Sequence, residues 1–180
     1  MILRRIFTIG TRAAVPALAM ALAACSGFGD RAPTVSQPSF YRDLAAGNAL
    51  DANGAAAMIS NYRTNNGLPP VTLDPALMKM ADEQAHAMAA RNKLDHAVVG
   101  TFQARLKRSG FDAAAAAENI SAGYHTMAEA FSGWRDSPQH KANMLLKSAT
   151  RMGIAAVYVP GTKYKVFWAL VLAAPDERKG

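Results

Sequence analysis

The stretch MGIAAVYVPGTKYKVFWALVL, residues 152–172, decides the fold of this chain. Residues 152–159 and 164–172 are apolar at almost every position, and the Pro-Gly-Thr-Lys segment between them is typical of a turn joining two strands. A strand with one face in water alternates between apolar and polar residues. Because these two strands do not alternate, we predict an α/β fold whose sheet is covered on both faces, a three-layer α–β–α sandwich.

Five helices are predicted upstream of this stretch, from apolar residues at helical spacing and from capping residues. They are expected over residues 51–65, from residue 74, around residues 102–106, from residue 126 and from residue 137. The clearest start is Thr126 with Glu129, a capping-box pattern in which each side chain bonds a free backbone N–H. Trp134 then completes an apolar stripe on that helix. The alanine-rich residues 113–117 give no clear signal.

The first 25 residues have the layout of a bacterial signal peptide. Arg4, Arg5 and Arg12 precede an apolar run over residues 13–24, which is too short to span a bilayer. The run ends in Leu-Ala-Ala-Cys at Cys25, which resembles the lipobox of bacterial lipoproteins, although an ordinary cleavage site beside a chance cysteine stays open. We predict a signal peptide over residues 1–24, lipidation at Cys25, a lipidated tether over 25–48, one domain over 49–174 and a polar tail over 175–180.

Composition agrees with export. Cys25 is the only cysteine, so the domain has no internal disulfide and its core alone must hold the fold. The net charge is +7, but only 17 of the 20 basic residues follow Cys25, against 13 acidic residues. No Lys/Arg stripe with interleaved aromatic residues is present, so nucleic acid is not an expected partner. A mild attraction to anionic lipid headgroups is more natural.

Four short motifs carry the information on function. They are His96 after Asn-Lys-Leu-Asp, Glu-Asn-Ile at 118–120, Trp-x-x-Ser-Pro-x-His at 134–140, and Met-Gly-Ile at 152–154. In this order they resemble the CAP superfamily, named for cysteine-rich secretory proteins, antigen 5 and pathogenesis-related 1 proteins, and in particular its bacterial, disulfide-free branch. The resemblance covers roughly residues 48–174. It implies an α–β–α sandwich, which the strand pattern indicates independently.

The resemblance also implies a cleft with two histidines and two glutamates. The histidines correspond to His96 and His140 and one glutamate to Glu118, whereas Ser137 stands at the position of the second glutamate. Two roles stay open for the three matching residues. They are a first shell for a weakly bound divalent cation such as zinc, or a buried hydrogen-bonded network that holds loops together. His86 is expected to face solvent.

The CAP family has been linked to the binding of sterols, fatty acids and other lipids, and to protein contacts at the cell surface. We therefore predict a binding module for a lipid, another apolar ligand or an envelope protein, and assign no catalytic residue. Ser26 after the lipidated cysteine resembles the signal for the outer membrane, so we expect the domain to face the periplasm. The alternative is a hydrolase, either a Ser–His enzyme using Ser137, His140 and Glu118, or a metal-assisted enzyme with Asp95 or Asp136 as its general base. Against the Ser–His enzyme, Ser137 before Pro138 is expected to cap a helix with its hydroxyl.

Overall fold

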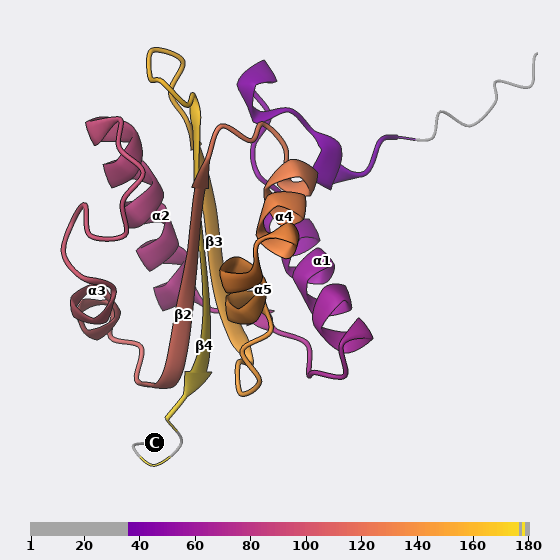
Figure 1. Ribbon diagram of the computed structural model, residues 1–180, viewed down its shortest axis with the longest axis vertical. Coiled ribbons are helices and arrows are strands. Elements are labelled where there is room, and N and C mark those ends of the chain that lie inside the picture. The colour runs from indigo at the N-terminus through magenta and orange to yellow at the C-terminus, as the bar shows by residue number, and fades with distance from the viewer. Residues whose placement is uncertain (1–35, 177, 179–180) are drawn as a thin grey trace, which may run out of the picture. The chain divides into compact units, whose positions relative to one another are not determined.

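The computed structural model describes residues 36–176 and residue 178. Within these residues the chain forms two short 3-10 turns, five α-helices and four strands (Figure 1). The elements are, in order, η1 (Ser39–Tyr41), η2 (Leu44–Ala46), α1 (Ala52–Asn65), β1 (Thr72–Leu73), α2 (Pro75–Arg91), α3 (Phe102–Ser109), β2 (Ala113–Ala122), α4 (Met127–Asp136), α5 (Pro138–Met144), β3 (Arg151–Tyr158) and β4 (Val166–Pro175).

The sheet has the strand order β1-β3-β4-β2. The short β1 runs parallel to β3, and the β3–β4 and β4–β2 pairs are antiparallel. Figure 1 shows α2 and α3 on one face of this sheet and α1, α4 and α5 on the other. The predicted three-layer α–β–α sandwich is therefore confirmed.

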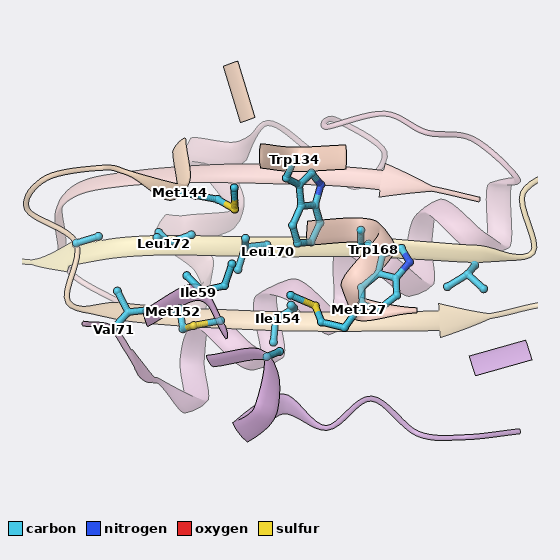
Figure 2. Packing of buried hydrophobic residues seen from close by; sticks show 14 of the residues in the cluster. Ile59, Val71, Met127, Trp134, Met144, Met152, Ile154, Trp168, Leu170 and Leu172 are labelled. Carbon is cyan, nitrogen blue, oxygen red and sulfur yellow. The ribbon is translucent and has the colours of Figure 1, made fainter. Parts of the chain in front are cut away.

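Strand β4 explains why its sequence does not alternate. It lies between β3 and β2, and each of its faces contributes to a different hydrophobic cluster. One face, with Trp168 and Leu170 among its residues, packs under α1, α4 and α5, as Figure 2 shows. The other face, with Phe167 and Val171, packs under α2. Every second residue serves one cluster, so the whole strand has to be apolar.

Gly153 in β3 marks a close approach between layers. A Cβ atom at this position would collide with the backbone of Leu77 in the first turn of α2. Glycine is thus required by the packing of α2 on the sheet rather than by a turn. This contact gives the Met-Gly-Ile motif a structural reason.

Two parts of the chain differ from the sequence interpretation. The alanine-rich residues 113–117 open β2, which pairs with β4 through Ala122. Residues 36–48, assigned to the tether, pack on the domain: Leu44 is buried in the core and Phe40 lies against it. The backbone N–H of Leu44 donates to the carbonyl of His125 at 3.0 Å, and the Ser39 hydroxyl donates to Asp51 at 2.6 Å. The domain therefore begins before residue 49.

Candidate functional site

The structure brings His96 and Glu118 into direct contact. His96 lies in the loop between α2 and α3, and Glu118 is on β2. The imidazole Nδ1 of His96 is 2.7 Å from Oε1 of Glu118. The glutamate side chain is only 2% exposed, whereas the imidazole is 53% exposed. The buried Glu118 carboxylate thus contacts the Nδ1 side of the His96 ring, and the rest of the ring is partly exposed to solvent.

The pKa of His140 is lowered in the folded protein. The residue is on α5 and half-buried. Burial lowers the pKa of its imidazole below the usual value of 6.5, and positive charge on His96 lowers it further. His140 is thereby biased towards the neutral form, the form that binds metals and accepts hydrogen bonds. His96 contacts Glu118, and the side chain of the next residue, Asn119, bonds the backbone of His140, so these three sequence-predicted residues share one region of the molecule.

Two asparagines fasten this region to the sheet. Asn119, next to Glu118 on β2, donates through its side-chain amide to the carbonyl of His140 at 3.0 Å. Asn143 on α5 donates to the Asn119 side chain at 2.9 Å and to the Glu118 carbonyl at 3.0 Å. These bonds hold α5, and with it His140, against β2.

Arg105 on α3 is the site residue whose role the sequence did not reveal. Its Nη2 donates to Oε1 of Glu118 at 2.8 Å and to the carbonyl of His96 at 3.0 Å. The side chain is 1% exposed, so this is a buried ion pair. The sequence placed Arg105 on a helix beside Phe102 and Leu106, and an arginine on the buried face of an amphipathic helix is the one signal for such a role.

The residues present do not fit a three-ligand metal centre. In the described part of the chain, no three His, Cys, Asp or Glu side chains are grouped so as to hold a metal ion. Oε1 of Glu118 already accepts from both Arg105 and His96. Ser137, which replaces the second family glutamate, supplies no carboxylate. Of the two roles left open by the sequence, the weakly bound divalent cation is therefore not favoured by this geometry.

Ser137 does not cap α5 as the sequence suggested. It ends α4 and precedes α5 as the only residue between them, with φ −93° and ψ 120°. Its carbonyl accepts from Lys141 at 2.8 Å, but its hydroxyl makes no bond to the helix. The tight junction between two helices sets the backbone here. The Ser–His hydrolase interpretation gains no support, because no hydrogen bond from the Ser137 hydroxyl to His140 is found in the residues described.

The remaining histidines lie outside this region. His86 is exposed on α2, where its ring bonds the Asp82 carbonyl at 3.1 Å, as its predicted outward position requires. His125 lies 3.7 Å from the Asp43 carboxylate. It helps to attach the segment before α1 to the loop that precedes α4.

A separate apolar groove runs beside α1. Its volume is about 650 Å³, and its walls come from residues 38–40, α1 and α4. Phe40, Met58, Tyr62 and Phe131 supply apolar surface, and the exposed residues Asn61, Asn65 and Arg135 also line the groove. Tyr62 and Phe131 meet edge to face, with ring centroids 5.3 Å apart. The groove shares no lining residue with the His96–Glu118 site.

The described helices include none that combines the length and the apolar character needed to cross a bilayer. Cys25 and its flanking residues lie outside the described residues. Lipidation at Cys25 therefore stays a prediction.

Comparisons with known proteins agree with the fold. The uncharacterized protein YkwD of Bacillus subtilis is 31% identical over 97 residues, which cover 53% of this chain and 38% of that protein. An extracellular protein containing a SCP domain from Bacillus anthracis is 26% identical, with a TM-score of 0.57 over 68% of this chain and 41% of that chain. This chain therefore spans less than half of either relative.

A third similar structure matches over nearly its whole length. An outer surface protein from Borrelia burgdorferi has a TM-score of 0.61 at 17% identity, over 72% of this chain and 98% of that chain, a likeness of fold alone. Residues 56–172, well over half of the chain, match the family described as "CAP: Cysteine-rich secretory protein family". The chain belongs to the CAP family.

Proposed function

We propose that this protein is an exported, lipid-anchored CAP domain that binds an apolar ligand in the groove between residues 38–40, α1 and α4. The groove carries the proposal. Its volume of about 650 Å³ falls in the range of small-molecule sites, roughly 300–1,000 Å³. Such sites are mostly apolar and carry a few polar groups that orient the ligand.

The chemistry of the groove walls favours a mostly apolar molecule that also carries a polar group. Phe40, Met58 and Phe131 offer aromatic and flexible thioether surface, which adapts to varied apolar shapes. Asn61 and Asn65 supply hydrogen-bond donors, and Arg135 adds a positive charge that is paired with Asp136. A lipid or a similar amphiphile matches this combination of apolar and polar groups.

A lipid anchor at Cys25, which stays a prediction, supports the choice of a lipid as the ligand. Thirteen residues lead from Cys25 to Pro38 at the edge of the groove. A chain of this length reaches at most about 45 Å. We therefore propose that the domain works at the periplasmic face of the outer membrane, within reach of lipids and other envelope proteins.

Binding of the neutral apolar dye N-phenyl-1-naphthylamine to unacylated residues 26–180 tests the groove. Ala57 lines the groove and is exposed, so Ala57→Trp should fill it without disturbing the core. The dye affinity should fall at least tenfold. Ala90→Trp is the matched control, an exposed alanine on α2 in the opposite layer. Equal affinity in the two variants would reject the groove as the binding site.

A further inference from the structure

Glu118 is a buried carboxylate and needs a positive partner. Its side chain is 2% exposed, and an ionised carboxylate at such a position is stable only when it is paired and hydrogen-bonded. A bound divalent cation was one of the two roles that the sequence left open for this cleft. Here Arg105 lies 2.8 Å from Glu118, and its guanidinium is itself 1% exposed. The positive charge that pairs with Glu118 therefore comes from a side chain of the protein, the Arg105 guanidinium.

Arg105 is fixed on several sides. Its Nη2 bonds the His96 carbonyl at 3.0 Å as well as Glu118, and its Nε points to the Gly100 carbonyl at 3.4 Å. The guanidinium also lies over the ring of Phe102, 5.6 Å from the centroid. Arg105 thus joins the loop that carries His96 to the strand that carries Glu118.

The same carboxylate oxygen orients His96. Oε1 of Glu118 accepts from Arg105 and lies 2.7 Å from Nδ1 of His96. An ionised carboxylate can only accept hydrogen bonds, so Nδ1 must carry the hydrogen. The other ring nitrogen, Nε2, is then left as an acceptor on a half-exposed ring.

We propose that Arg105 is a positioning residue that takes the place of a metal ion in this cleft. It holds the Glu118 carboxylate turned towards His96, and it thereby fixes His96 in the Nδ1–H tautomer, with Nε2 left as an acceptor. Oε1 of Glu118 serves as the orienting atom, Oε2 is buried without a hydrogen-bond partner in the described residues, and the carboxylate is not a metal ligand. The cleft offers an acceptor nitrogen to a ligand with an N–H or O–H donor. This proposal is independent of the apolar groove.

Nitrogen-15 NMR of the histidine side chains tests the tautomer directly. At about pH 8, where imidazoles are neutral, His96 of the wild-type mature chain should show a protonated Nδ1 and a bare Nε2. Arg105→Met should abolish this preference. Arg108→Met is the matched control, because Arg108 lies on the same helix and is exposed. A wild-type His96 with its hydrogen on Nε2 would overturn the proposal.

Zinc titration calorimetry tests whether Glu118 is a metal ligand. Glu118→Gln should change the zinc affinity of the protein less than tenfold, because the carboxylate is not a ligand. Arg105→Met should raise that affinity at least tenfold by releasing the carboxylate, and the Arg105→Met/Glu118→Gln double variant should lose the gain. A tenfold or greater loss in Glu118→Gln alone would overturn the proposal. Should the variants fail to fold, a wild-type His96 with its hydrogen on Nε2 still overturns the proposal.

Discussion

The indole rings of Trp134 and Trp168 meet edge to face, with centroids 6.4 Å apart and planes at 87° (Figure 2). Trp134 comes from α4 and Trp168 from β4, and neither is more than 1% exposed. The Trp168 indole N–H donates to the Tyr124 carbonyl at 2.8 Å, whereas the Trp134 N–H is buried without a partner in the described residues. This pair joins the outer helical layer to the sheet.

Trp134→Ala should lower the free energy of unfolding by about 3–5 kcal/mol, because it removes a buried aromatic ring and leaves a cavity. Trp134→Phe keeps an aromatic ring and removes the unpartnered N–H, so it should cost clearly less. Urea denaturation of both variants measures the difference. A loss within about 0.5 kcal/mol for Trp134→Ala would mean that the ring is not part of the core.

Arg63 on α1 is fully buried without an acidic partner in the described residues. Its guanidinium donates to the carbonyls of Pro69, Met144, Leu146 and Ala149 at 2.7–3.0 Å. Burial lowers the pKa of this guanidinium below its usual value. Four backbone carbonyls therefore stabilise the buried guanidinium charge in place of a carboxylate.

Arg63→Met should destabilise the domain by about 3 kcal/mol or more, because several buried carbonyls lose their donor at once. Arg63→Lys keeps the charge but cannot span all four acceptors, so we expect an intermediate loss. Thermal and urea unfolding of the two variants give the comparison. A loss below about 1 kcal/mol for Arg63→Met would show that water can replace the guanidinium.

Ser137→Glu restores the carboxylate that the family carries between α4 and α5. A third ligand beside His96 and His140 should raise zinc affinity at least tenfold over the wild type, because negative charge attracts the cation. Calorimetry with Ser137→Gln as the uncharged control measures the gain. If zinc binding is unchanged, or survives His140→Ala, the inserted carboxylate does not face the imidazoles.

His140 predicts a pH dependence of stability. Its pKa is lowered in the folded protein, so the unfolded chain binds more protons between the folded pKa and about pH 6.5. Stability should therefore fall as the pH drops through this window and should be unaffected by His140 above it. His140→Gln removes this loss, so the wild-type advantage in unfolding free energy should shrink between pH 8 and pH 5.5. An advantage that is the same at both pH values would contradict the prediction.

Cys25→Ser should release the protein from membranes or leave its signal peptide uncleaved. The reason is that serine has no thiol to receive the diacylglycerol. Membrane fractionation and the electrophoretic mobility of the two forms check this outcome. A variant that fractionates and migrates like the wild type would show that Cys25 is not lipidated.

Local patterns predicted most of the elements. Capping of α2 by Asp74 and the Thr126–Glu129 capping box are present, because a cap depends on residues only two or three positions apart. Strand β2 escaped prediction since alanine has little preference for strands and small side chains give no clear alternation. Its place is set by pairing with β4, for example Ala117 with Leu172. Because the two strands are far apart in the sequence, a local pattern cannot predict that they pair.

Some residues of the site were also predicted from the sequence, whereas the role of Arg105 was not. The order of four motifs, through its resemblance to the CAP family, singled out His96, Glu118 and His140. Arg105 was seen only as a member of a helix. The role of its charge becomes clear only in the folded chain, where Arg105 on α3 contacts His96 in the loop before α3 and Glu118 on β2.

The sequence by itself determined that the sheet is covered on both faces, because a strand without a polar position cannot border water. It also determined where α2 and α4 begin, through short-range capping. Only the tertiary structure decided that Glu118 pairs with Arg105, that Ser137 leaves its helix uncapped, and that an apolar groove forms beside α1. Each of these depends on the distance between side chains from different elements, which is fixed when the layers pack and not before.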